Sequence, residues 1–164
     1  MTTRYGTHMT SFVATPATIV NARLWGGVSK EYKDTWEEPD NANGDVTIVG
    51  PLPIDFVPSS ILFASDALGA GTANVGLYKK NSDGTFTAVS AECFASDIAV
   101  TTAVAQTEVL FEAAATDIAN TNKSLWQWAG LSARPDYAEL FIALTFDTGT
   151  SSAGTIRLVV RGTE

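Results

Sequence analysis

Histidine and cysteine are nearly missing from this sequence, which contains one of each, His8 and Cys93. A single cysteine excludes an intramolecular disulfide, and the apolar neighbours of Cys93 predict a small core residue. A catalytic triad or a histidine-based metal site would depend on His8. That residue lies in a stretch without helix or strand periodicity, which cannot hold it against a nucleophile. The sequence therefore predicts no enzyme, no catalytic residue, no metal site and no cofactor.

Basic residues and long apolar runs are also scarce. Ten Lys and Arg stand against 18 Asp and Glu, and Lys79-Lys80 is the only adjacent basic pair. Nucleic acid binding requires clustered basic residues, so we expect no nucleic acid partner. No apolar run approaches the roughly 18–20 residues of a membrane span, and the N-terminus lacks the apolar core of a signal peptide. We expect no membrane partner and a product that stays in the cytoplasm unless an assembly carries it out.

What the sequence does contain is typical of one β-rich domain. Its length suits a single domain, and 45% hydrophobic with 17% charged residues is the composition of a folded protein. Ala and Thr are abundant and the strong helix formers are few, which favours strands. Residues 1–13 show no periodicity and predict a flexible N-terminal arm. Residues 14–164 are predicted to form the single β-rich domain.

Short extended segments separated by turn signals recur along this domain. We expect strands at Thr18–Trp25, Val28–Trp36, Asp45–Val49, Ile61–Ala64, Val75–Lys80, Thr85–Val89, Glu108–Phe111, Ala138–Phe146 and Thr155–Arg161. Ser124 and Gln127 form a capping box and Gly130 follows, so a short helix is expected near residues 125–129. The pattern predicts an all-β fold, a single antiparallel β-sandwich or jelly-roll-like barrel.

Two loops resemble ligand-binding motifs but lack essential parts. The segment Gly69–Asn74 begins like a dinucleotide fingerprint, yet a strand follows it rather than the helix that would hold a pyrophosphate. We therefore interpret its glycines as turn residues. The loop Asn41–Asp45 resembles the first half of a calcium loop without the later glycine or the closing carboxylate. A polar hairpin loop is the main interpretation, with a weak calcium site using Asp40 and Asp45 as the alternative.

Acidic and aromatic residues provide the remaining candidates for function. Trp36 is surrounded in sequence by four acidic residues, Asp34, Glu37, Glu38 and Asp40. Carboxylates beside an aromatic ring are found in glycosidases and on sugar-binding faces, and also in ordinary solvated loops. The sequence has four tryptophans, Trp25, Trp36, Trp126 and Trp128. Some of these belong to the core, while surface aromatic residues commonly anchor protein interfaces.

The order of several short motifs resembles a known class of virion protein. The motifs are the Pro-rich Gly50–Pro58, Asp66–Thr72, Phe94–Asp97, Ser124–Trp126 and Ala153–Ile156. Over roughly Asp45–Gly162 this order resembles the capsid decoration (cement) or head-fibre-type proteins of tailed bacteriophages. The resemblance implies a virion structural protein on the outer surface of the capsid, which binds the major capsid protein and stabilises the DNA-filled head. It also implies a homo-oligomer, with a trimer favoured.

Three functions thus remain open. For the decoration protein, we expect the partner-binding residues to be Arg4, Tyr5 and Phe12 in the arm, together with Trp36 and Trp126. The alternative is a phage host-recognition or carbohydrate-binding module, head-fibre or tail-associated, that uses Trp36 and the acidic loop. An enzyme such as a glycosidase is the third and least favoured.

Overall fold

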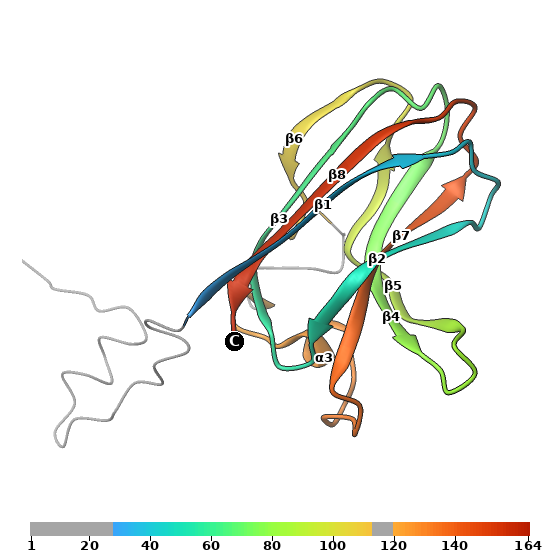
Figure 1. Cartoon of the computed structure of the whole chain (residues 1–164). Coiled ribbons are helices and arrows are strands. Elements are labelled where there is room, and N and C mark those ends of the chain that lie inside the picture. Colours follow the sequence, from blue (N-terminus) through green and yellow to red (C-terminus); the bar gives the residue numbers. More distant parts are fainter. Residues whose placement is uncertain (1–27, 113–119) are drawn as a thin grey trace, which may run out of the picture.

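The computed structural model describes residues 28–112 and 120–164, which form two packed antiparallel sheets (Figure 1). The elements are β1 (Ser29–Glu38), β2 (Val46–Pro53), β3 (Val57–Ser65), β4 (Thr72–Lys80), β5 (Phe86–Ala99), β6 (Val104–Glu108), α3 (Leu125–Trp128), β7 (Glu139–Thr148) and β8 (Gly154–Thr163). Sheet 1 has the strand order β1-β8-β3-β6, and sheet 2 has the order β2-β7-β4-β5. The predicted all-β fold is confirmed as a sandwich of two separate sheets. The strand expected at Thr18–Trp25 and the arm lie outside the described residues.

The core lies between the two sheets and follows the alternation of the strands. In β8, the side chains of Ile156, Leu158 and Val160 are at most 2% exposed, while those of Arg157 and Arg161 point outward. This alternation is the one expected for a strand with one buried face. Because each buried aliphatic or aromatic side chain contributes about 1.5–3 kcal/mol, this shared core is the main source of stability.

The stretch Ile61–Lys80 joins the two sheets. As predicted, it forms a strand, a glycine-containing connection and a second strand, but the two strands lie in opposite sheets, β3 in sheet 1 and β4 in sheet 2. The predicted hairpin that follows is confirmed within sheet 2, where Lys80 pairs with Phe86. Its turn is closed by the Asn81 N–H, which donates to the Thr85 carbonyl oxygen at 2.8 Å.

Several strands differ in extent from their predicted bounds, and β3 begins four residues earlier than expected, at Val57. β2 continues through Pro51 and Pro53, which the fold tolerates because β2 is an edge strand of sheet 2. The strand expected at Glu108–Phe111 instead runs over Val104–Glu108. After Glu108 the chain turns, with the Leu110 N–H donating to the Glu108 carboxylate at 3.1 Å and the Glu112 N–H to the Val109 carbonyl oxygen at 3.3 Å.

Strand β5 is longer and more irregular than the sequence suggested. Its register against β4 shifts between Val75 and Leu77, whose partners are Ala95 and Ser90. The extra residues cross directly over Gly76, where an added Cβ would lie 2.2 Å from the carbonyl carbon of Ala91. Gly76 therefore permits the close approach of the β5 bulge.

The short helix α3 is confirmed where the capping box predicts it. The Oε1 atom of Gln127 accepts the Ser124 N–H at 3.0 Å, and Gly130 follows the helix with φ +75°. Leu125 and Trp128 bury one side of the helix against the core. No helix among the described residues has the length and apolarity needed to cross a membrane.

Candidate functional site

Glu38 is the centre of a buried polar network that joins the two sheets. It ends β1, is 1% exposed, and accepts three hydrogen bonds from side chains. The Trp36 indole N–H donates to its Oε2 at 2.5 Å, while the Asn41 amide and the Thr47 hydroxyl donate to its Oε1 at 3.2 and 2.9 Å. Thr47 belongs to β2, so this carboxylate links the edge strand of sheet 1 to the edge strand of sheet 2.

This network separates the carboxylates that the sequence placed around Trp36. Glu37 and Glu38 are consecutive strand residues and point to opposite faces of β1. Glu37 is exposed and its Oε2 accepts the Thr155 hydroxyl at 3.1 Å, whereas Glu38 is buried. Trp36 is partly buried against the core and directs its N–H inward. The structure therefore uses Glu38 and Trp36 as internal partners and leaves Glu37 on the surface, bonded to Thr155.

The glycine-rich turn between β3 and β4 packs against the loop between β7 and β8. Gly69 and Gly71 have φ values of +73° and +97°, in the left-handed region that favours glycine. A Cβ at Gly71 would lie 2.6 Å from the carbonyl oxygen of Thr148. The Ser151 and Ser152 N–H groups both donate to the Leu68 carbonyl oxygen, at 3.0 and 3.1 Å. This geometry agrees with the turn interpretation and leaves no helix N-terminus for a phosphate.

The calcium-like loop is held by its own hydrogen bonds. The Asp45 carboxylate accepts the Ala42 N–H at 2.7 Å, and the Asn41 amide donates to Glu38 and to the Pro39 carbonyl oxygen. Among residues 28–112 and 120–164, no three His, Cys, Asp or Glu side chains lie close enough together to hold a metal ion. The loop therefore has the geometry of a polar turn.

Exposed carboxylates gather at the end of the sandwich that carries these loops, which we call the loop end. The loop end comprises residues 39–45, 66–71, 97–103 and 147–153, which the main chain joins through hydrogen bonds such as Leu68 N–H to the Val100 carbonyl oxygen. The acidic residues of the loop end are all exposed: Asp40, Asp45, Asp66, Asp97 and Asp147. Glu37, at the end of β1, is an exposed carboxylate beside them. These four segments contain no Lys or Arg. Such a surface repels nucleic acid and other anions.

The outer face of sheet 2 carries apolar side chains. Tyr78, Phe141 and Ala143 form a buried cluster there, against which Ile48 and Ala91 pack. Phe141 and Phe86 meet edge to face with ring centroids 5.0 Å apart, and Phe86 keeps 37% of its surface exposed. Val46, at 38% exposure, extends the same face along β2, because it pairs with Thr145 two residues beyond Ala143.

The outer face of sheet 1 is different. It presents an ion pair between Glu31 and Arg161 at 2.7 Å, together with Lys33. The outer face of a sandwich is usually polar, so the apolar face of sheet 2 is the feature that calls for a function. A hollow of about 510 Å³ adjoins Phe141 and is bordered by Lys79, Lys80, Tyr137 and Glu139. We define Val46, Ile48, Tyr78, Phe86 and Phe141 as the apolar face, the candidate protein interface.

The sequence contained one signal for this face. The apolar run in β7 predicted a strand covered on both sides, and the structure confirms it. Leu140 and Ile142 enter the core while Phe141 and Ala143 enter the outer cluster. The contribution of Phe86 was not predicted, because its position opposite Lys80 depends on the register of β4 and β5.

The expected partner-binding residues occupy separate places. Arg4, Tyr5 and Phe12 lie outside the described residues. Trp36 and Trp126 are both partly buried and pack against the core, at different elements. The structure therefore does not bring Trp36 and Trp126 together on one exposed surface.

The other aromatic residues near α3 pack together, with Phe94 and Trp128 buried and Phe111 42% exposed. Trp128 is 6% exposed and lies between Phe94 and Phe111, with ring centroids 5.2 and 6.1 Å away. Cys93 precedes Phe94 and packs against the same core, and burial raises the pKa of its thiol to about 12. Cys93 therefore stays protonated, as expected of a core residue rather than a nucleophile.

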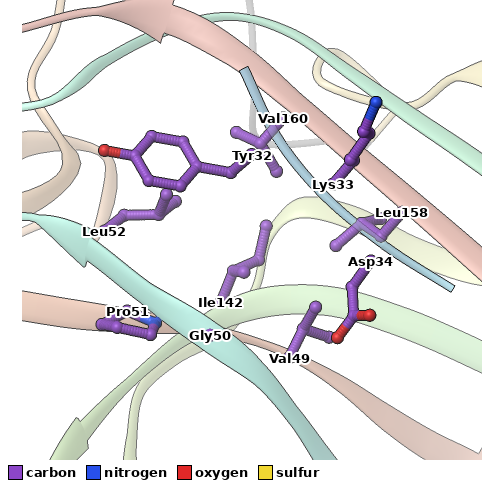
Figure 2. A pocket seen from close by; sticks show the side chains of 10 residues that line it. All are labelled: Tyr32, Lys33, Asp34, Val49, Gly50, Pro51, Leu52, Ile142, Leu158 and Val160. Carbon is purple, nitrogen blue, oxygen red and sulfur yellow. The ribbon is translucent and has the colours of Figure 1, made fainter. Parts of the chain in front are cut away.

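A second apolar feature is the groove between β1 and β2, where the sandwich is open (Figure 2). We call it the edge groove. It has a volume of about 160 Å³ and is floored by Ile142, Leu158 and Val160. Figure 2 shows Asp34 extending from β1 toward Val49 of β2 across this opening. The floor of the edge groove is apolar, and its side chains Ile142, Leu158 and Val160 are at most 3% exposed.

Comparison with known proteins identifies the fold. No protein-family model matches the chain, and no curated protein matches it. Among solved structures, the chain is similar to a chain of the capsid asymmetric unit of cyanophage Pam1, with a TM-score of 0.52 and 16% sequence identity. The match covers 89% of this chain and 91% of that chain. At this identity the similarity shows a shared β-sandwich fold.

Proposed function

We propose that this chain is a virion structural protein, specifically a capsid decoration (cement) protein of a tailed bacteriophage. It binds the major capsid protein on the outer surface of the head and stabilises the DNA-filled shell, in a non-enzymatic role. The observation that carries the proposal is the fold shared over 89% of the chain with a chain from a phage capsid. The motif order along Asp45–Gly162 supports the same function independently of that comparison.

The apolar face supplies the contact that this function requires. Phe86 and Val46 keep 37% and 38% of their surface exposed on this face, beside the buried rings of Tyr78 and Phe141. Exposed aromatic side chains commonly anchor protein interfaces. Lys79, Lys80 and Glu139 border the hollow beside it and provide a polar rim. This face therefore contacts the capsid or a neighbouring copy of the chain.

The charge distribution supports a position outside the shell. The chain has a net charge of −8, and the loop end carries carboxylates without basic residues. Packaged DNA would repel such a surface, whereas the outside of the shell imposes no such cost. Binding to the assembled shell but not to its dissociated subunits stabilises the shell by mass action. A trimer would strengthen each modest contact through avidity.

Mixing the purified protein with its cognate emptied capsids tests the proposal. We expect stoichiometric, saturable binding, and heads that withstand heating better after decoration. Replacing Phe86 with Glu at the apolar face should weaken binding, whereas replacing exposed Glu92 with Gln should not. Absence of binding to heads, together with tail localisation by immuno-labelling, would overturn the proposal.

The host-recognition or carbohydrate-binding alternative makes a separate prediction. A sugar-binding tryptophan stacks an exposed ring on the sugar, but Trp36 packs against the core and donates its N–H to Glu38. We therefore expect no binding on a glycan array. Binding that is lost on Trp36→Phe would favour the alternative, because Phe keeps the packing and removes only the indole edge.

A further inference from the structure

We propose that the outer face of sheet 2 binds the same face of a second copy of this chain, with the strands of the two copies antiparallel. The inference rests on the proposed function for the presence of neighbouring copies on the head, and it assigns the apolar face to a second copy rather than to the capsid. Three features support it: exposed apolar side chains on this face, charges of opposite sign at its two ends, and the distance between those ends within one chain.

One end of the face, at the turn between β4 and β5, is basic and carries an exposed aromatic ring. Lys80 lies two residues beyond Tyr78, so the period of a strand places its side chain on the same outer face. Its partner across the sheet is Phe86, which keeps 37% of its surface exposed. Within the described part of the chain, no ion pair involves Lys79 or Lys80. The hollow that they border has Glu139 as its one carboxylate, so its net charge is positive.

The other end of the face, at the loop end, is acidic and carries an exposed aliphatic side chain. Asp147 lies four residues beyond Ala143 on β7, and therefore on the outer face. Its carboxylate accepts the Asn74 amide at 2.7 Å, and the Asn74 side-chain oxygen accepts the Asp97 N–H at 2.7 Å, which brings Asp97 to the same place. Val46, 38% exposed, lies at the level of Asn74, two strands away. The four segments of the loop end contain no Lys or Arg.

One chain cannot bring its two oppositely charged ends together. Lys80 lies six residues beyond Asn74 on β4, a distance of about 20 Å. In Figure 1 the arrowheads of β4 and β7 mark the basic end and the acidic end. The Debye length at physiological ionic strength is about 8 Å, so salt screens the attraction between these ends within a chain. The opposite charges can therefore meet only between copies.

A two-fold axis through the middle of the face joins both pairs of ends at once. When two copies turn these faces toward each other with antiparallel strands, Lys80 of each copy approaches Asp147 of the other. The exposed side chains of Phe86 and Val46 are then removed from water between the faces. Parallel strands would instead place acidic end on acidic end, and like charges repel. Charge therefore selects the antiparallel pair, an isologous contact that closes with two copies.

The size of the face predicts a weak dimer. Four strands about 4.8 Å apart and nine residues long give a face of roughly 550 Å² per copy, against about 800 Å² per partner in a stable interface. Tyr78 and Phe141 are at most 9% exposed before the copies pair, so they add little further burial. We expect a Kd of about 10 μM or weaker in solution, strengthened by avidity on a head. A dimer takes the place of the trimer that the motif resemblance favours.

Exchanging charges between two variants of the full-length chain tests the arrangement by sedimentation equilibrium. Lys80→Glu places a carboxylate against Asp147 at both contacts of the pair, and Asp147→Lys places an ammonium group against Lys80. Each variant alone should therefore associate at least about tenfold more weakly than the unmodified chain. Mixed in equal amounts, the two variants should pair within about threefold of the unmodified affinity, because every contact of the mixed pair again joins opposite charges.

The matched control is Lys33→Glu, the same change of charge on the outer face of sheet 1. It should leave the Kd of the chain within about threefold, and it should not restore the association of Asp147→Lys. Circular dichroism checks that each variant is folded. Because Asp147 also holds Asn74, Asp45→Lys at the same end takes its place if Asp147→Lys does not fold.

Three results would overturn the proposal: no association of the unmodified chain up to about 1 mM, a trimer in place of a dimer, or mixed variants that associate no better than each alone. The assay contains no heads, so it is independent of capsid binding. A chain that binds heads but stays monomeric would keep the proposed function and overturn this inference. A chain that forms the charge-selected dimer but binds no heads would do the reverse.

Discussion

Replacing Glu38 with Gln tests whether the buried carboxylate holds the two sheets together. Gln keeps the size of the side chain and one acceptor oxygen, which can serve Asn41 and Thr47, whose donors now share Oε1. Its amide nitrogen then takes the place of Oε2 and faces the Trp36 indole N–H, now 2.5 Å from that oxygen. Two donors would meet where a charge-assisted hydrogen bond existed.

The expected loss follows from this one bond. A hydrogen bond to a charged group contributes about 1.5–3 kcal/mol, and Glu38 is 1% exposed, so water cannot replace it. We expect Glu38→Gln to lower the free energy of unfolding by about 2 kcal/mol and Tm by about 4–8 °C. Glu38→Ala should lower the free energy further, because it also leaves the donors of Asn41 and Thr47 without the carboxylate.

Urea denaturation and thermal unfolding followed by circular dichroism measure these changes. Glu37→Gln is the matched control, since Glu37 is the exposed neighbour and bonds only to Thr155, and it should change the free energy by less than about 0.5 kcal/mol. A loss for Glu38→Gln no greater than that for Glu37→Gln would refute the role given to the network.

Three further predictions concern other parts of the sandwich. At pH 8, iodoacetamide should alkylate Cys93 about a thousandfold more slowly in the folded chain than in the urea-unfolded chain. The thiolate is the reactive form, and burial raises the pKa of the thiol from 9.0 to about 12. Similar rates in the two states would contradict the burial of Cys93. The raised pKa also means that the stability Cys93 contributes is complete below about pH 9 and is lost as pH rises toward 12. Gly71→Ala should lower the free energy of unfolding, measured by urea denaturation, by at least about 3 kcal/mol. Gly84 also has a positive φ, +87°, but no atom lies within 4 Å of an added Cβ, so Gly84→Ala should lower it by only about 1 kcal/mol. Equal losses for the two variants would contradict the close packing at Gly71. The pKa of Glu31 is held below its ordinary value chiefly by the hydrogen bond from Arg161, so Arg161→Gln should raise it in an NMR titration, and an unchanged pKa would contradict that contact.

Local patterns predicted several elements because the signals that form them lie within a few residues. The β4–β5 hairpin, the capped helix α3 and the alternation of β8 each depend on neighbours in sequence. Their positions in the sheets do not. Nothing in Ile61–Lys80 indicates that β3 and β4 belong to different sheets, because that choice depends on β8 and β7, which follow about 60 or more residues later.

The residues of the candidate surfaces were likewise predicted only where the signal was local in sequence. The apolar run in β7 indicated a strand covered on both faces, but Phe86 and Val46 join the apolar face only through strand register. The carboxylates around Trp36 formed a cluster in sequence, and the alternation of β1 sends Glu37 outward and Glu38 inward. Tertiary pairing therefore decided which of these residues reach the surface.

Cryo-electron microscopy of cognate heads with the purified protein added tests the central proposal most directly. We expect density for the sandwich on the outside of the shell at full occupancy, with the apolar face of sheet 2 against the major capsid protein or a neighbouring copy. Heads without such density, or density in which that face is exposed to solvent, would contradict the proposed role in capsid decoration.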